Sequence, residues 1–413
     1  MQFQLRVLND GKEETWYYDN LQNVVLDSEK VNRFESLRWT HLKSIKLNGA
    51  DTDFKYNETI RTLYISLGLK CNFHCKYCYQ TNLCKSKYVD ASPSKVSTFI
   101  QLIKDSGLQL EKEQSDIILY GGEPLVYWKT LKLLIPELRK LFPDTKISFI
   151  TNGSLLTKEV CDFCLEYKVG FTVSYDGQHT LRDYPVFNDP KIVEIYKYAM
   201  EIGVEVAVLP LVANGHDLPT VTEKELCKKF NRKINIGYHS IFKCSSETDA
   251  HFEIGALPEK QQKEYIRMLE EALKLPLSEM EGSLLSRLNE IRFSIVHGIP
   301  PYSTRAACCN ATGNILSVDF DGNIITCMNY PDKKWGSIKD YRTVKITDYY
   351  SPLNHKACRE CPYLNICLGA CPLIKNEHSE AFKINCTNFK CYAIPMFQKT
   401  IESLFGVKLL EVL

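Results

Sequence analysis

The sequence predicts an α/β protein in which strands and helices alternate. Between residues 60 and 240, short apolar runs alternate with helical stretches about six times. Regular alternation of this kind implies parallel strands joined by right-handed helical crossovers. The pattern alone leaves open two arrangements, a partial barrel and an open doubly wound sheet. Residues 257–297 are predicted to be helical, whereas residues 301–413 are rich in cysteines and turns and nearly free of long periodic stretches.

Each expected strand of the alternating region is a short apolar run, and several end at a glycine or asparagine turn. The expected strands cover residues 60–69, 116–120, 146–150, 169–175, 204–209 and 234–238. The expected helices cover residues 94–106, 128–141, 157–168, 192–202 and 223–230.

The first sixty residues are expected to form a small N-terminal α+β extension. Residues 2–8 and 15–19 flank Asn9-Asp10-Gly11, which predicts a hairpin, and residues 31–42 are expected to form a short helix. The alternating start predicts a strand rather than a signal peptide. We expect domain boundaries near residues 60 and 300, giving an extension at 1–60, a central domain at 61–300 and a C-terminal domain at 301–413.

Composition and charge narrow the class of protein. Hydrophobic residues make up 44% and charged residues 24% of the chain, and the net charge is +1. These values exclude a disordered, fibrous or coiled-coil protein, and no global charge favours nucleic acid or a membrane surface as a partner. No run of about 18 apolar residues is present, so we expect a cytoplasmic protein. Seventeen cysteines are unusually many for a cytoplasmic protein, and they indicate metal or redox chemistry.

Three cysteines follow the first expected strand directly. Cys71, Cys75 and Cys78 have the spacing C-x3-C-x2-C, with which a tight loop can direct three thiolates to one iron–sulfur cube. The fourth iron would then be open to a small molecule. A zinc site is the alternative, but it normally needs a fourth protein ligand. His74 is expected to pack or hydrogen-bond rather than to ligate. The next strand ends in residues 121–124, Gly-Gly-Glu-Pro, where glycines let a ligand approach closely.

A second cysteine group gives the strongest signal in the chain. Upstream of it, Gly322 and Cys327 form a G-x4-C pattern, and Cys309 precedes them. A zinc ribbon remains open, because four cysteines suit zinc too, whereas a reducing cytosol disfavours a disulfide module. The group consists of Cys358, Cys361, Cys367, Cys371 and Cys386.

Residues 71–79 together with 121–124 resemble the radical S-adenosylmethionine (radical SAM) superfamily. The resemblance covers residues 60 to about 240 and implies a partial (β/α)6 TIM-like barrel. It implies that Cys71, Cys75 and Cys78 bind a [4Fe–4S] cluster whose open iron is chelated by SAM. Reductive cleavage of SAM would then give a 5′-deoxyadenosyl radical that abstracts hydrogen. The SAM-binding residues that the resemblance implies are Tyr79, Gly121, Gly122, Glu123, Pro124, Asn152, Ser174, Asp176, Leu209 and Leu211.

Residues 305–391 resemble the SPASM domain, an irregular cysteine-rich iron–sulfur domain with two auxiliary [4Fe–4S] clusters. With the barrel cluster, three clusters are implied. The resemblance assigns Cys309, Cys327 and Cys371 to the first auxiliary cluster and Cys358, Cys361, Cys367 and Cys386 to the second. The first cluster therefore has only three assigned ligands. The candidates for its fourth ligand are, in order of preference, Cys308, no protein ligand (an open iron) and Cys391.

The two resemblances imply an oxidoreductase that modifies a ribosomally made precursor peptide, and we expect a side-chain cross-link. An electron donor such as flavodoxin or ferredoxin is expected. A sulfatase-type protein maturase and a non-catalytic iron–sulfur or zinc protein are the alternatives. No catalytic side chain is assigned.

Several other residues have more ordinary interpretations. Arg182 and Asp183 follow the Asp176-Gly177 turn, where contact with substrate is one expectation. Edge pairing of residues 2–8 with an extended leader is another. The remaining cysteines are expected to pack as small hydrophobic residues: Cys84, Cys161, Cys164, Cys227 and Cys244.

Overall fold

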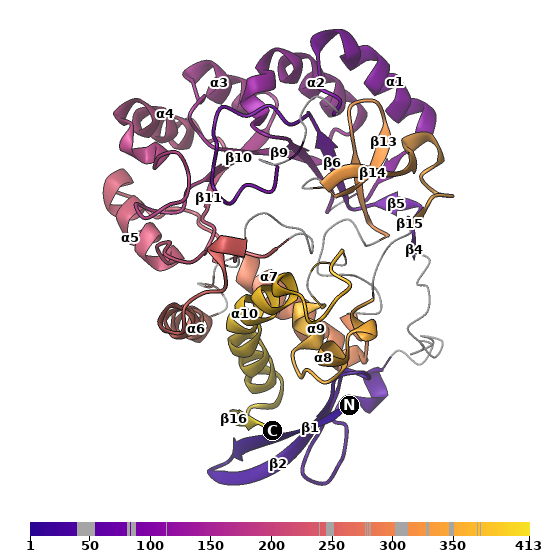
Figure 1. Cartoon of the computed structure of the whole chain (residues 1–413), viewed down its shortest axis with the longest axis vertical. Coiled ribbons are helices and arrows are strands. Elements are labelled where there is room, and N and C mark those ends of the chain that lie inside the picture. Colours follow the sequence, from indigo (N-terminus) through magenta and orange to yellow (C-terminus); the bar gives the residue numbers. More distant parts are fainter. Residues whose placement is uncertain are drawn as a thin grey trace. The chain divides into compact units, whose positions relative to one another are not determined.

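The computed structural model divides the chain into two compact units (Figure 1). The barrel unit contains Asp53–Ser240 and Cys309–Thr347, and the terminal unit contains Met1–Thr52, Ile241–Cys308 and Asp348–Leu413. The structure describes residues 1–38, 54–80, 83, 88–112, 114–238, 240–244, 252–276, 278, 280, 282–301, 313–327, 330–346, 351–369, 371 and 373–413.

The barrel unit is built on a sheet of eight strands in the order β11-β10-β9-β8-β6-β12-β13-β14. Its first five strands pair in parallel, and a single parallel bridge from Val208 to Ile236 marks the sixth expected strand. The prediction of a parallel α/β core is therefore confirmed. The five strands are β6 (Thr62–Ser66), β8 (Asp116–Tyr120), β9 (Lys146–Thr151), β10 (Val169–Ser174) and β11 (Val206–Leu209).

One helix follows each of these strands, and Figure 1 shows the five helices in an arc outside the sheet. In α1 the buried residues Val96, Phe99, Ile100 and Ile103 recur at helical spacing, so one stripe faces the strands. The helices are α1 (Val96–Ser106), α2 (Trp128–Leu141), α3 (Lys158–Glu166), α4 (Pro190–Glu201) and α5 (Pro219–Phe230).

Residues beyond 312 extend the same sheet. The strand β12 (Ile315–Val318) pairs in parallel with β6, and β13 (Asn323–Cys327) and β14 (Tyr330–Ser337) continue in antiparallel fashion. The compact units therefore do not follow the linear boundaries expected near 60 and 300. The physical reason is strand pairing, which joins a segment beyond 312 to the first strand of the barrel.

The terminal unit contains a four-stranded sheet in the order β16-β1-β2-β3, built from β1 (Gln2–Asn9), β2 (Lys12–Asp19), β3 (Val24–Leu26) and β16 (Lys408–Val412). The expected hairpin is present, and its turn residues Asp10 and Gly11 have φ of 47° and 78°, as a two-residue hairpin turn requires.

Two expectations for this region are wrong. The strand β1 pairs with β16 on one side and β2 on the other, so residues 2–8 offer no free edge to a leader. The helix expected at 31–42 is a single turn, η1 (Glu35–Leu37), within the described residues, and residues 39–42 lie outside them.

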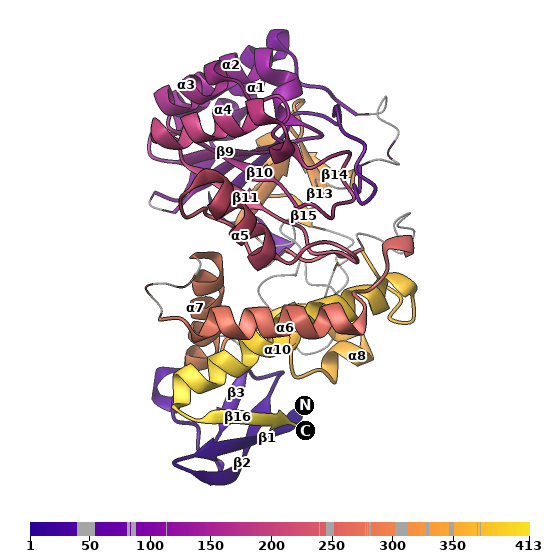
Figure 2. The same ribbon diagram turned by 90° about the vertical axis from the view of Figure 1, so that its left-hand side faces the viewer.

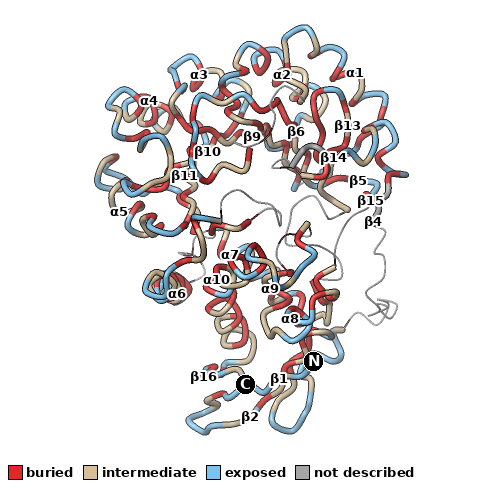
Figure 3. Tube along the Cα trace, viewed as in Figure 1, coloured by how far each residue is buried: buried red, intermediate tan, exposed pale blue. Residues whose placement is uncertain are grey.

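Helices fill the rest of the terminal unit. The sequence shows no long periodic stretch after residue 301, yet α10 has 26 residues, so this helix was not predicted. Its buried residues lie on nearly every side, so the sequence carries no apolar stripe (Figure 3). Figure 2 shows α6 running beside α10. The helices are α6 (Glu259–Lys274), α7 (Gly282–His297), α8 (Lys356–Arg359), α9 (Leu364–Cys367) and α10 (Glu380–Phe405).

Within the described part of the chain, no helix combines the length and apolar character needed to cross a bilayer.

Candidate functional site

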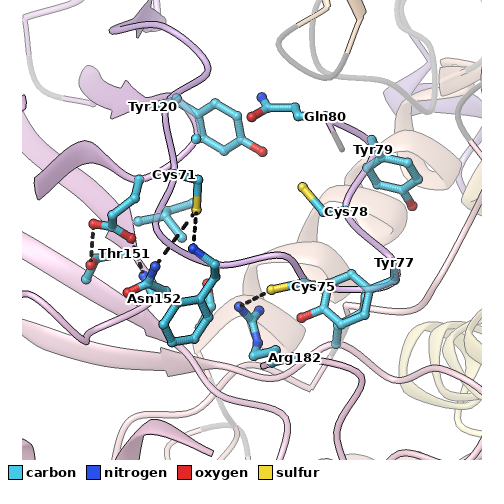
Figure 4. Close-up of a pocket in the computed structure, with 17 residues that line it drawn as sticks. Cys71, Cys75, Tyr77, Cys78, Tyr79, Gln80, Tyr120, Thr151, Asn152 and Arg182 are labelled. Carbon is cyan, nitrogen blue, oxygen red and sulfur yellow. Dashed lines mark hydrogen bonds between the residues drawn. The ribbon is translucent and has the colours of Figure 1, made fainter. Parts of the chain in front are cut away.

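A cavity opens at the carboxyl ends of the parallel strands, where a barrel of this kind places its active site (Figure 4). The loop after β6 supplies the three expected thiols to it, and the ends of β8, β9 and β10 supply most of the remaining wall. The lining residues are Cys71, Phe73, Cys75, Tyr77, Cys78, Tyr79, Gln80, Tyr120, Gly121, Gly122, Glu123, Ile150, Thr151, Asn152, Ser174, Arg182 and Leu211.

Seven of the ten predicted SAM-binding residues are among these lining residues. Three are not: Pro124 begins the one-turn helix η4 (Pro124–Tyr127), Leu209 ends β11, and Asp176 is fully buried and bound to other side chains. The sequence analysis missed Phe73, Tyr77, Gln80, Tyr120, Ile150 and Thr151. A strand-end signal was available for Tyr120, Ile150 and Thr151, because parallel strands place their last residues at this edge.

Backbone contacts with the glycine pair fix the start of the cysteine loop. Gly122 N donates to Gly68 O at 2.9 Å, and Glu123 N donates to Lys70 O at 2.8 Å. A Cβ atom on Gly122 would lie 2.3 Å from Lys70 O, and one on Gly121 would lie 2.7 Å from Gly68 O. We expected a ligand to require these glycines. The structure adds a contact within the chain that also requires them.

The Tyr127 hydroxyl supports the same loop from the other side. It donates to Asp90 Oδ1 at 2.7 Å and accepts from Lys70 N at 2.9 Å. Burial, followed by the hydrogen bond to Asp90, raises the pKa of Tyr127, so the hydroxyl keeps the proton that it donates. The Lys70 ammonium also pairs with Asp90 Oδ2 at 2.7 Å.

Glu123 ties the end of β8 to the end of β9. Its carboxylate accepts from the Thr151 hydroxyl at 2.7 Å, from Asn152 N at 2.6 Å and from Leu125 N at 3.0 Å. Burial raises the pKa of Glu123, although these donors oppose the effect. Asn152 continues the link, since its Nδ2 donates to Asn72 Oδ1 at 2.9 Å and lies 4.0 Å from the Sγ atom of Cys71.

A buried ion pair holds the middle of the cysteine loop. Asp176 accepts from the Tyr77 hydroxyl at 2.6 Å and from Arg182 Nε at 2.9 Å through one oxygen, and from Leu211 N at 2.8 Å through the other. Arg182 Nη1 lies 3.9 Å from Cys75 Sγ. We expected Arg182 to contact substrate. In the structure its guanidinium bonds to Asp176 and lies beside Cys75 of the cysteine loop.

Residues 181–183 also hold the loop through backbone bonds. Lys76 N donates to Leu181 O at 2.9 Å, and His74 N donates to both carboxylate oxygens of Asp183 at 3.0 Å. Leu181 N donates to His216 Nε2, so the other ring nitrogen carries the proton that it donates to the Leu211 carbonyl at 2.6 Å. Asp183 is thus engaged by the cysteine loop, and the imidazole of His74 is largely exposed.

The three thiols and their surroundings fit an iron–sulfur cluster. Phe73 N donates to Cys71 Sγ at 3.4 Å, and Arg182 approaches Cys75, so N–H groups already face two of the sulfur atoms. Burial raises the pKa of Cys75 to about 11, with Arg182 opposing the effect. Among the described residues, no three His, Cys, Asp or Glu side chains converge as they would around one metal ion. A cube differs, because each thiolate binds a separate iron atom.

Four cysteines of the second group lie near one another in the terminal unit. Burial, then the neighbouring thiols of Cys367, Cys386 and Cys361, raise the pKa of Cys358. By contrast, the Cys391 thiol donates to Thr387 O on its own helix at 3.4 Å, and burial raises its pKa to about 11.

The other cysteines fall into three groups: two further predicted cluster ligands, four cysteines without a predicted ligand role, and three that lie outside the described residues. Cys327 ends β13 in the barrel unit, and Cys371 belongs to the terminal unit. Cys161, Cys164 and Cys244 are buried and Cys227 is half-buried, and none of the described cysteines forms a disulfide. Cys84, Cys308 and Cys309 lie outside the described residues, so the first auxiliary set stays a prediction.

Comparison with protein families agrees with this geometry. Residues 65–229 match the radical SAM superfamily. The chain contains a radical SAM domain. The matched segment begins in β6 and ends in α5, and it includes every residue that lines the cavity. Residues 65–229 therefore form a radical SAM domain, and SAM and a [4Fe–4S] cluster are the cofactors that this family uses.

Individual relatives extend the comparison beyond the radical SAM domain. The radical SAM cyclopropyl synthase TigE of Paramaledivibacter caminithermalis is 22% identical over 401 residues, which cover 89% of this chain and 80% of TigE. A GTP 3′,8-cyclase of Staphylococcus epidermidis is 29% identical over 169 residues, or 39% of this chain and 48% of the cyclase.

Among solved structures, anSMEcpe with bound AdoMet and the Cp18Cys peptide has a similar fold. The TM-score is 0.59 at 16% sequence identity, and the alignment covers 84% of this chain and 98% of anSMEcpe. At this identity the likeness concerns the fold.

Proposed function

We propose that this radical SAM enzyme is a peptide maturase, which abstracts hydrogen from a ribosomally made precursor peptide and forms a side-chain cross-link. The observation that carries the proposal is the cavity at the strand ends, where Cys71, Cys75 and Cys78 share one wall with the residues expected to bind SAM. Such a site suits cofactor chemistry, in which the protein supplies ligation, orientation and exclusion of water.

When bound, the cluster and SAM would supply a 5′-deoxyadenosyl radical. The chain's own contribution is to hold these groups in place. Cys71, Cys75 and Cys78 would ligate the cluster, and Gly121 and Gly122, which line the same cavity, would receive the amino end of SAM. Ser174 lies at the end of β10 and presents a hydroxyl to the same cavity. Glu123 acts mainly by fixing Thr151 and Asn152, since its oxygen atoms already accept bonds from them.

A SPASM-type domain with two auxiliary clusters remains part of the proposal. It is supported by the four neighbouring thiols around Cys358 and by the fold shared with anSMEcpe. Cys358, Cys361, Cys367 and Cys386 would ligate one cluster. Cys309, Cys327 and Cys371 would ligate the other, with Cys308 ahead of Cys391 as a fourth ligand. Cys391 is the less favoured fourth ligand, because its thiol donates a hydrogen bond to a carbonyl group of its own helix.

A peptide substrate is supported by two of the similar proteins. The structure of anSMEcpe contains a bound peptide, and TigE, whose alignment spans most of this chain, is a cyclopropyl synthase. Ring closure of that kind joins two carbon atoms, as a cross-link does. The sulfatase-type maturase remains the runner-up, with the same radical chemistry and a different protein as substrate. A reduced flavodoxin or ferredoxin would supply the electron.

The test is anaerobic incubation of the reconstituted enzyme with SAM and a reductant, in one arm with a short peptide encoded near its gene and in a second arm with a sulfatase peptide that contains the active-site residue. The proposal predicts release of 5′-deoxyadenosine together with a short peptide lighter by two hydrogen atoms. An unchanged short peptide together with oxidation of the sulfatase peptide would favour the runner-up.

A further inference from the structure

A buried turn at the end of the N-terminal hairpin contacts the second cysteine segment. We call residues 18–23 the asparagine turn, because Asn20 and Asn23 are both fully buried there and Tyr18 precedes them. Every residue of this turn, and every contact described below, belongs to the terminal unit. Buried amides are costly unless their hydrogen bonds are satisfied, so their partners indicate what the turn does.

Asn20 holds the backbone between two cysteines. Its amide nitrogen donates to Arg359 O and to Cys361 O, each at 2.9 Å. Arg359 is the last residue of α8, whose carbonyl groups lack partners inside so short a helix. One amide therefore uses both of its hydrogens to fix the chain from Cys358 to Cys361.

The same turn also holds α9, which carries Cys367. Asn365 lies on α9 and is 1% exposed. Its amide nitrogen donates to Asn20 O at 2.7 Å and to the Tyr18 hydroxyl at 2.9 Å. The two short helices that carry cysteines thus meet on one turn.

The turn is itself anchored on the opposite side. The Tyr18 hydroxyl donates to Asn23 Oδ1 at 2.9 Å. Asn23 Nδ2 donates to the Ser294 hydroxyl on α7 at 2.9 Å and to Ile299 O at 3.1 Å. A polar network that is buried and bonded in this way is rigid, because each lost bond leaves a desolvated group behind.

We propose that Asn20 is a positioning residue that holds Cys358, Cys361 and Cys367 in the arrangement that binds the second auxiliary cluster. Helices of four residues are unstable by themselves, and no disulfide joins the described cysteines, so the arrangement needs an external support. The N-terminal sheet supplies that support through its turn. The inference rests on the proposed function, since the auxiliary cluster is part of it.

The test compares two matched substitutions in the full-length reconstituted enzyme. Asn20→Asp keeps the size and the acceptor oxygen but removes both donated bonds. Asn388→Asp is the control, because Asn388 is also fully buried in the terminal unit, donates to Phe242 O and accepts from Leu257 N. We expect Asn20→Asp to lose about four iron atoms per chain and the paramagnetic resonance signal of one cluster, whereas Asn388→Asp keeps both.

Two further variants keep the inference falsifiable. Asn365→Leu removes the bonds of α9 to the turn without changing Asn20, and it should also lower the iron content if Asn20→Asp fails to fold. The triple variant with Cys358, Cys361 and Cys367 replaced by alanine reports whether the cluster exists, because one remaining thiolate cannot hold a cube. If this triple variant keeps the iron content of the wild type, the auxiliary cluster is absent, and the proposed SPASM-type assignment fails together with this inference. If the triple variant loses iron but Asn20→Asp and Asn365→Leu keep it with unchanged spectra, only the role of Asn20 is overturned.

Discussion

The cysteine loop at residues 71–78 and the cysteine segment at residues 358–367 are held in different ways. In the first, backbone groups that follow β8 and β10 bond directly to the loop, glycines permit the close approach, and nearby side chains such as Asp176 and Asp183 add further bonds. In the second, side-chain amides from a distant turn bond to two helices of four residues each. A parallel sheet places its strand ends at one edge, so it supplies backbone partners that an irregular segment lacks.

The difference indicates where each site is vulnerable. The barrel loop has many backbone and side-chain partners, so it should tolerate the loss of a single uncharged side-chain bond but not a change that separates the strand ends or leaves a buried charge unpaired. The second segment should depend on a few side chains, above all Asn20.

The largest effect is expected from removing the barrel thiols. Replacing Cys71, Cys75 and Cys78 together by alanine should reduce release of 5′-deoxyadenosine below detection, because the cube loses all its ligands. Iron should fall by about four atoms per chain, while the cysteines at 358–386 keep theirs. Chromatographic assay of 5′-deoxyadenosine and iron analysis measure the two quantities. Continued SAM cleavage by this variant would show that the barrel cysteines were wrongly assigned.

A smaller but still severe effect is expected at the glycine pair. A side chain on Gly122 would overlap Lys70 O, so Gly122→Val should push the cysteine loop away from β8 and reduce SAM binding by at least about a hundredfold, that is by about 3 kcal/mol. Equilibrium dialysis with labelled SAM measures it.

Gly282→Ala is the matched control, because a Cβ atom there meets nothing within 4 Å. It should bind SAM as the wild type does. A folded Gly122→Val enzyme with unchanged SAM affinity would show that the close contact does not hold the loop.

Arg182 offers a test of electrostatics in the barrel loop. Arg182→Met removes a cation near Cys75 and leaves the buried carboxylate of Asp176 without its ion pair, which should cost about 3–5 kcal/mol of stability. The reduction potential of the barrel cluster should fall, because a nearby positive charge favours the reduced form.

The double variant Arg182→Met/Asp176→Asn should recover part of the stability but not the potential. Potentiometric titration followed by paramagnetic resonance measures the reduction potential, and thermal unfolding measures the stability. An unchanged potential in Arg182→Met would show that the guanidinium only positions the loop.

The smallest expected effect is a pH dependence from Glu123. Burial raises its pKa, so at pH values between the ordinary carboxyl pKa and the raised one the folded chain binds more protons than the unfolded chain. Stability should therefore fall as pH rises through that window. Glu123→Gln cannot ionise and should lack this fall, so the stability difference between the two chains should change across that pH window. Thermal unfolding at a series of pH values measures the difference, and a constant difference would contradict the assignment.

The barrel could be predicted because its signals are local. The strand at Asp116–Tyr120 matches its prediction residue for residue, since an apolar run ends there at a glycine pair. The 26-residue helix α10 was missed because it is buried on nearly every side and includes Pro395, so it shows no apolar stripe. The pairing of β1 with β16 joins opposite ends of the sequence, and no local pattern announces such a contact.

The residues of the candidate site likewise divide into those that a local motif predicts and those that depend on contacts between distant parts of the sequence. Cys71, Gly122 and Ser174 could be placed in the cavity from sequence, because each lies in a recognisable motif or at a strand end. The bond between Tyr77 and Asp176 could not, since it joins residues 99 positions apart. Asn20 gave no signal at all, because an asparagine after a strand is an ordinary turn residue.

The central claim is that the cavity directs a radical to a peptide carbon, and isotope transfer tests it most directly. The peptide that the enzyme modifies is made with fully deuterated amino acids and incubated anaerobically with the enzyme, unlabelled SAM and a reductant. The account predicts 5′-deoxyadenosine that contains one deuterium, in step with modification of the peptide. Unlabelled 5′-deoxyadenosine together with an unmodified peptide would contradict it.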